Sequence, residues 1–128
     1  MKPHILVVDD EPAVLAVAVR TLRGAGYRVT GASNGHDALA AIDTGDFDLL
    51  ITDVRMPEMS GDELSRRARL EWSDLPVLYL TGYADQLFGK RKTLREREAF
   101  LEKPFTPTAL EEAVATLLAS SEQANVRE

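Results

Sequence analysis

Short apolar runs alternate along the chain with segments in which apolar residues recur at the period of a helix. The runs occupy residues 5–8, 27–32, 49–53, 77–81 and 99–102. Strands of a parallel sheet are buried on both faces, so they read as continuous apolar runs. The alternation of such runs with helical segments predicts an α/β protein, in which helices cover both faces of a doubly wound parallel sheet.

The segments between the apolar runs carry start and stop signals for helices. Pro12 suits the first turn of a helix, and Gly24 marks its end. Asn34 is expected to cap a second helix that ends at Gly45. Further helices are predicted over residues 62–71, 85–97 and 107–118, with Thr106 as the N-cap of the last, and residues 119–128 are expected to form a polar tail after a domain at 1–118.

Charged residues follow three of the apolar runs directly. Asp9 and Asp10 follow the first run, and Asp53 ends the third. Lys103 follows the last run. Because ligands of open α/β sheets bind beyond the carboxyl ends of the strands, we expect three carboxylates and one ammonium group to form a chemical site at one edge.

The composition narrows the class of protein. The 128 residues fit one domain, which at this size buries about two thirds of its unfolded surface. The absence of cysteine removes disulfides and Cys-ligated metals, and is most compatible with a reducing compartment. A net charge of −6 argues against direct nucleic-acid binding, which depends on basic side chains. The first apolar run is too short for a signal peptide or a membrane span, so we expect a cytoplasmic protein.

Positive charge gathers in one segment, at Lys90, Arg91, Lys92, Arg95 and Arg97. Glutamates are interleaved with the last of these residues, so the pattern is typical of a solvated helix face. The alternative interpretation is a face on which a partner protein docks.

The residues at the strand ends belong to an ordered set of motifs. These are Val-Val-Asp-Asp-Glu-Pro at 7–12, Ile-Thr-Asp-Val-Arg-Met-Pro at 51–57, Ser-Gly at 60–61, Leu-Thr-Gly at 80–82 and Lys-Pro-Phe at 103–105. No single motif is specific. With all of the motifs in this order and at this spacing, the chain resembles the receiver domain of two-component response regulators over about residues 4–118. The resemblance implies a flavodoxin-like sheet of five parallel strands in the order 2-1-3-4-5, with five helices. It also implies a cis peptide bond between Lys103 and Pro104.

The resemblance assigns a metal site and a phosphoacceptor. Asp53 would attack the phosphohistidine of a partner, either a sensor histidine kinase or a histidine phosphotransfer protein. Mg²⁺ would be bound by Asp10, Asp53 and the backbone carbonyl of Arg55, and by Asp9 through water. Clustered carboxylates repel one another and raise at least one pKa unless a cation lies between them, which supports this assignment.

The resemblance also assigns the residues that contact and sense the phosphoryl group. Lys103 and the Thr81 hydroxyl would contact phosphoryl oxygens, together with backbone groups of Gly82 and Arg55. Thr81 would move toward the phosphoryl group, and Phe100 would swing into the space left behind. Arg55 and Tyr83 occupy positions that tune hydrolysis of the acyl phosphate in this family.

Each site residue also has an ordinary structural interpretation. Asp10 would serve as the N-cap of the first helix, and Asp53 as a turn residue at a strand end. Thr81 fits a strand by propensity, and a lone lysine such as Lys103 is usually exposed. Their joint placement at the ends of neighbouring strands favours the site.

Two other functions fit part of the pattern. A phosphatase of the haloacid dehalogenase class combines an Asp nucleophile with Thr, Lys and an acidic metal site, but it carries a second Asp two residues after the nucleophile. Here that position is Arg55. A receiver fold that acts only as an interaction module would usually lack an Asp or the Lys of the site. We therefore expect a phosphoacceptor domain of a phosphorelay, and not an enzyme.

A downstream partner is expected at the faces around the fourth helix, the fifth strand and the fifth helix, where the basic segment and Phe100 fall. No output domain is expected after Leu118, because the remaining residues are few and polar. The chain would then be either a stand-alone regulator or the C-terminal receiver of a hybrid histidine kinase.

Overall fold

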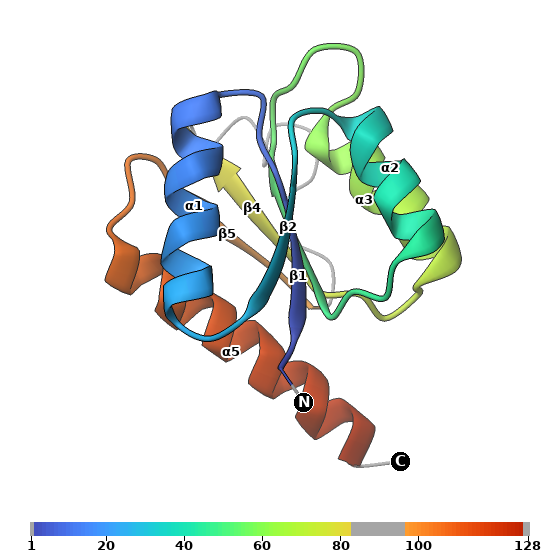
Figure 1. Cartoon of the computed structure of the whole chain (residues 1–128). Coiled ribbons are helices and arrows are strands. Elements are labelled where there is room, and N and C mark those ends of the chain that lie inside the picture. Colours follow the sequence, from blue (N-terminus) through green and yellow to red (C-terminus); the bar gives the residue numbers. More distant parts are fainter. Residues whose placement is uncertain (1, 83–96, 127–128) are drawn as a thin grey trace.

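The computed structural model describes residues 2–82 and 97–126 of the chain. In these residues the strands are β1 (His4–Val8), β2 (Arg28–Ala32), β3 (Leu49–Asp53), β4 (Val77–Thr81) and β5 (Glu98–Glu102). The helices are α1 (Pro12–Gly24), α2 (Gly35–Thr44), α3 (Gly61–Glu71) and α5 (Pro107–Val126), as Figure 1 shows. Each strand coincides with one of the apolar runs to within a residue, which confirms the predicted α/β class.

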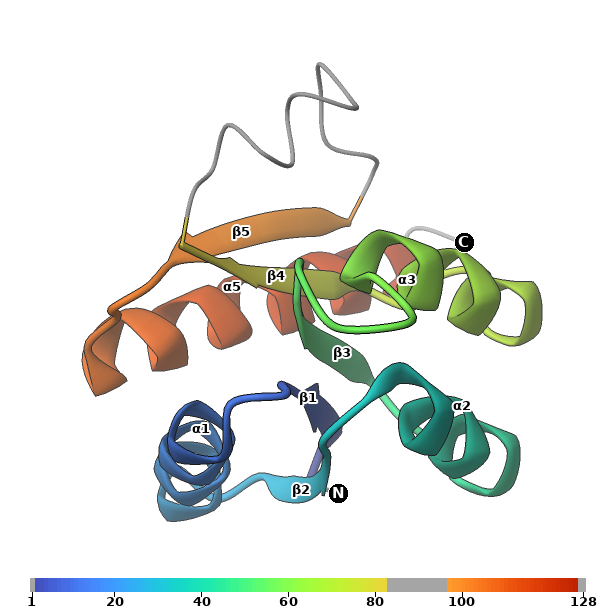
Figure 2. The same ribbon diagram turned by 90° about the horizontal axis from the view of Figure 1, so that it is seen from above.

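The strands form one parallel sheet in the order β2-β1-β3-β4-β5. This is the order that the resemblance implied. Helices α1 and α5 cover one face of the sheet, and α2 and α3 cover the other (Figures 1 and 2). The strand order reverses between β1 and β3, and in open α/β sheets this switch point is where ligands bind.

Successive residues of the central strands point alternately into two hydrophobic cores. Leu6 and Leu50 belong to the core beneath α2 and α3, whereas Ile5 and Ile51 belong to the core beneath α1 and α5. Every residue of β3 and β4 is buried. Burial on both faces is the physical reason that these strands appear in the sequence as uninterrupted apolar runs.

The N-caps of two helices are confirmed, and one alternative is wrong. The side chains of Asn34 and Thr106 each accept a hydrogen bond from a backbone N–H in the first turn of α2 and α5, at 2.8 and 3.1 Å. The N-cap of α1 is Glu11, whose side chain makes no capping hydrogen bond. Asp10 is therefore not the cap of α1, which removes its ordinary structural interpretation.

Two features differ in extent from the prediction. The structure describes four of the five expected helices, because the helix predicted over residues 85–97 lies outside the described residues except for Arg97, as do Tyr83 and the rest of the basic segment. Helix α5 continues to Val126, beyond Leu118 where the polar tail was expected to begin. Residues 119–126 contain neither proline nor glycine to stop it. Within the described part of the chain, no helix is long and apolar enough to cross a membrane.

A buried polar network ties α3 to β4 and β5. The Tyr79 hydroxyl lies 2.7 Å from Ser65 Oγ and donates a hydrogen bond to Glu98 Oε2 at 3.0 Å. Arg69 Nη1 forms an ion pair with the same Glu98 oxygen at 3.2 Å. The Glu98 side chain is fully buried, and a buried carboxylate is tolerated when partners such as these satisfy it.

We expect Tyr79→Phe to lower the free energy of unfolding by about 1–3 kcal/mol, because it removes a hydroxyl shared by two buried polar groups. Tyr27→Phe is the matched control, since the structure gives the half-buried Tyr27 no side-chain hydrogen bond among the described residues, and its effect should stay within about 0.5 kcal/mol. Urea denaturation measures both. Equal effects would contradict the structural role of the network.

Candidate functional site

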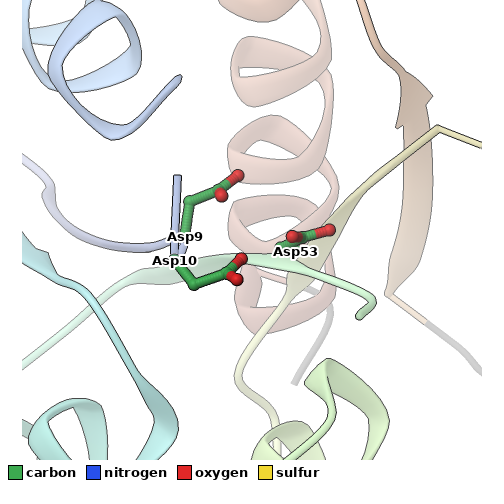
Figure 3. Close-up of side chains that lie close together, drawn as sticks. All are labelled: Asp9, Asp10 and Asp53. Carbon is green, nitrogen blue, oxygen red and sulfur yellow. The ribbon is translucent and has the colours of Figure 1, made fainter. Parts of the chain in front are cut away.

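Three carboxylates meet at the carboxyl ends of β1 and β3. Asp9 and Asp10 follow β1, and Asp53 is the last residue of β3. Because Val8 pairs with Thr52, the side chains of Asp9 and Asp10 reach toward Asp53, as Figure 3 shows. Oxygen atoms of the three groups all lie within 4.8 Å of one another.

Lys103 brings a positive charge to this cluster from the far side of β4. Its backbone N–H donates to the Thr81 carbonyl at 2.8 Å, which extends the pairing of β4 and β5 by one residue. Its ammonium nitrogen lies 3.1 Å from Asp9 Oδ2 and 3.4 Å from Asp53 Oδ2. The same nitrogen donates a hydrogen bond to Glu11 Oε1 at 3.1 Å. One ammonium group therefore faces three carboxylates.

The crowding of charge shifts the protonation of the site. Burial, followed by the neighbouring Asp9 charge, raises the pKa of Asp53 from 3.8 to about 6. Burial also raises the pKa of Asp9, although Lys103 opposes this effect. Burial acts to lower the pKa of Lys103, but its carboxylate partners, chiefly Asp9, outweigh burial and raise that pKa. The site therefore holds more negative charge than its one cation balances.

The donor set fits a hard divalent cation such as Mg²⁺. All three clustered groups are carboxylates, the ligands that Mg²⁺ and Ca²⁺ prefer. Asp9 Oδ2 is buried and accepts no hydrogen bond from the described residues, although Lys103 lies close to it. Asp10 is exposed and offers a carboxylate at the open side of the cluster. A cation here would relieve the repulsion that raises the pKa of Asp53.

The loop between β3 and α3 closes tightly over Asp53. A Cβ atom on Gly61 would lie 2.2 Å from the Asp53 carbonyl oxygen, so only glycine permits this approach. The Gly61 N–H donates to the Val54 carbonyl at 2.9 Å, and the Arg55 N–H points at Asp53 Oδ1 from 3.4 Å. The loop thus fixes the backbone on both sides of the Asp53 side chain.

The remaining predicted site residues lie around this centre. Thr81 is buried at the end of β4, and the adjacent Gly82 is exposed, as is the Arg55 side chain. Phe100 lies opposite Tyr79 on β5 and packs, half-buried, against the core beneath α2 and α3. The peptide bond between Lys103 and Pro104 is cis, as the resemblance implied.

Glu11 is the one charged contact of Lys103 that we did not expect from the sequence. It lies 92 residues from Lys103 in the chain and reaches the ammonium group from the N-cap of α1. The only signal in the sequence is its position directly after the Asp9 and Asp10 pair. Because Glu11 follows Asp9 and Asp10 directly, its side chain also starts from the carboxyl edge of the sheet.

Comparison with known proteins identifies relatives over nearly the whole chain. The family model of the response regulator receiver domain matches residues 5–115. The sensor kinase CckA of Brucella abortus is 35% identical over 116 residues, which are 89% of this chain and 12% of CckA. The response regulator receiver protein CpdR of the same organism is 36% identical over 80% of this chain and 85% of its own length.

A solved structure gives the same likeness in three dimensions. The receiver domain of the hybrid histidine kinase CckA matches with a TM-score of 0.77 and 38% sequence identity, over 90% of this chain and 98% of that domain. The chain spans a small part of the CckA kinase and about half the length of other curated relatives. The likeness therefore concerns one domain of those longer proteins.

The raised pKa of Asp53 predicts a stability that depends on pH when metal is removed. In the unfolded chain an aspartate titrates near 3.9, whereas folded Asp53 takes up its proton near pH 6. The stabilising contribution of this proton is present at low pH and is lost as the pH rises through 6. In buffer with a chelator, Asp53→Asn should therefore unfold with a free energy about 1–3 kcal/mol higher than the unmodified protein at pH 7.5.

Urea denaturation at pH 7.5 and pH 5 measures this difference, which should shrink at the lower pH. Asp43→Asn, which removes an exposed carboxylate of α2, is the control for the change in net charge and should have little effect. A destabilised Asp53→Asn at pH 7.5 would show that the carboxylate cluster is not under electrostatic strain.

Proposed function

The chain belongs to the response regulator receiver family, and from this premise we propose that it is a phosphorylation-activated switch whose phosphoacceptor is Asp53. The observation that carries the proposal is the position of Asp53, whose carboxylate lies 3.4 Å from the Lys103 ammonium and within 4.8 Å of two further carboxylates. A carboxylate placed between a fixed cation and a potential metal site has what phosphoryl transfer requires, namely positioning and charge neutralisation.

In the proposed reaction an Asp53 oxygen attacks the phosphorus of a phosphohistidine on a partner protein. An O–P bond forms, the N–P bond breaks, and the electron pair of that bond returns to the histidine ring. Lys103 neutralises charge on a phosphoryl oxygen, and the buried Thr81 donates its hydroxyl to another. Backbone N–H groups at Arg55 and Gly82 complete the contacts on the open side.

Mg²⁺ is part of the same proposal. Asp10, Asp53 and the Arg55 carbonyl would hold it directly, and Asp9 would hold it through water. When bound it supplies positive charge between the carboxylates and the incoming phosphoryl oxygens. Asp9 is also in contact with Lys103, so its carboxylate holds the ammonium group in place as well.

Phosphorylation would change the positions of side chains on β4 and β5. A phosphoryl group adds about two negative charges and three acceptor oxygens, which bias a nearby two-state element. Thr81 moving toward these oxygens would leave space beside β4, where Phe100 of β5 lies half-buried. The surface that changes would include β5 and α5, together with the predicted fourth helix outside the described residues.

The proposed partners are a sensor histidine kinase or a histidine phosphotransfer protein upstream, and a protein that binds the altered face downstream. The domain is proposed to be a phosphoacceptor and not an enzyme with a separate substrate. The alternative is an interaction module that works without phosphorylation, but such a module has no need for the lysine and the three carboxylates that this chain retains. Relatives of both kinds, CpdR and the CckA kinase, leave the stand-alone and the hybrid-kinase forms as alternative settings for the domain.

The test is intact mass after incubation with acetyl phosphate, a small-molecule phosphodonor, with and without Mg²⁺. We expect the protein to gain one phosphoryl group only when Mg²⁺ is present. Asp53→Asn should gain none, while Asp43→Asn should behave as the unmodified protein. A gain that persists in Asp53→Asn would overturn the site assignment. No gain in any condition, and none from a histidine kinase, would favour the interaction module.

A further inference from the structure

The ammonium group of Lys103 is crowded by carboxylates in the described structure, and the hydrogen bond that it donates there goes to Glu11 Oε1. An ammonium group carries three N–H donors. Its nitrogen lies within 3.4 Å of three carboxylates, those of Asp9, Glu11 and Asp53. A phosphoryl oxygen that approaches Lys103 therefore competes with carboxylates that already lie around the ammonium group.

The three carboxylates differ in how readily they can leave. Asp9 is fully buried, and a buried carboxylate that loses its cation pays a large desolvation penalty. Asp53 is the proposed acceptor, so phosphorylation turns its carboxylate into an acyl phosphate that stays beside Lys103. The Glu11 side chain is 61% exposed, and water replaces its lysine partner at little cost.

The backbone of Glu11 is held while its side chain is free to turn outward. Its N–H donates to Asp9 Oδ1 at 2.9 Å, and its carbonyl accepts from Leu15 N at 3.0 Å at the start of α1. Its side chain makes no capping hydrogen bond to α1. Releasing Lys103 therefore disturbs neither the helix start nor the buried Asp9.

We propose that Glu11 is a positioning residue that competes with the phosphoryl group for Lys103. In the unphosphorylated state its carboxylate occupies one N–H of Lys103, and it gives up that contact when the phosphoryl group arrives. This inference rests on the proposed function, because it requires an anion to bind beside Asp53. Glu11 thereby weakens the site's affinity for the phosphoryl group and favours the unphosphorylated state.

The test measures binding of beryllofluoride, a phosphoryl mimic, in saturating Mg²⁺ by fluorine NMR titration of the whole chain. Glu11→Gln should lower the half-saturating beryllofluoride concentration about two- to fivefold, the range expected for losing an exposed ion pair and a like charge. Glu71→Gln is the matched control, because it makes the same change in net charge at the far end of α3 and should leave that concentration unchanged. Thermal unfolding of the metal-free variants should show similar midpoints.

A cycle with Lys103→Met separates competition from a general effect of charge. If Glu11 acts by occupying Lys103, the gain from Glu11→Gln should largely disappear in the Lys103→Met background. A gain of equal size in both backgrounds, or no gain in the single variant, would overturn the role of Glu11. If the unmodified protein itself takes up no beryllofluoride in Mg²⁺, the proposed function fails, and this inference fails with it.

Discussion

One ammonium group placed among three carboxylates is the constraint around which the carboxyl edge of the sheet is built. Lys103 directly follows β5 and Asp9 directly follows β1, whereas Asp53 is the last residue of β3. In the observed strand order β4 separates β5 from β3, so the lysine must reach across two strand spacings, on the order of 10 Å. A long, flexible side chain meets that demand, and a shorter cation would not. The observed strand order therefore requires a cationic side chain at least as long as that of lysine at position 103.

The carboxylate site lowers the free energy of unfolding at neutral pH, and the hydrophobic cores offset this loss. Burial and mutual repulsion raise the pKa of Asp53 to about 6, so the ionised carboxylate destabilises the folded chain at neutral pH. Strain is stored beside it, since Glu58 adopts a φ of 71° and the Met59 N–H donates to the Pro57 carbonyl across a three-residue turn. The two hydrophobic cores beneath the helix pairs supply the free energy that offsets the ionised Asp53 and the strained turn at Glu58.

Local rules predicted most of the fold, because they act over a few residues. The apolar runs gave all five strands, and Asn34, Thr106 and the glycines marked helix ends where the structure has them. The strand ends also placed Asp9, Asp53 and Lys103 correctly at one edge. Composition alone misled on residues 119–126, where polar side chains suggested a tail although nothing in that segment stops a helix.

Two contacts between distant segments were not predicted from the sequence. The bond from Lys103 to Glu11 spans 92 residues, and the bond from Tyr79 to Glu98 joins two neighbouring strands whose register no local signal specifies. Asp10 shows the opposite failure: a local rule allowed it to cap α1, but the chain places Glu11 at that position and leaves Asp10 facing the acidic cluster. A capping preference of about 1 kcal/mol is too weak to fix a boundary to one residue.

Lys103 contacts both the carboxylates of the site and the backbone hydrogen-bond ladder between β4 and β5. Its side chain contacts Asp9, Glu11 and Asp53, while its backbone N–H bonds the Thr81 carbonyl. Tyr79, two residues before Thr81, lies opposite Phe100, three residues before Lys103. A change in which carboxylate holds Lys103 therefore acts on a residue whose backbone is part of the element that would carry a signal to the surface. Packed elements respond to such changes by choosing between discrete arrangements. In the proposed switch, the contacts on this one ammonium group would therefore contribute to the balance between those arrangements.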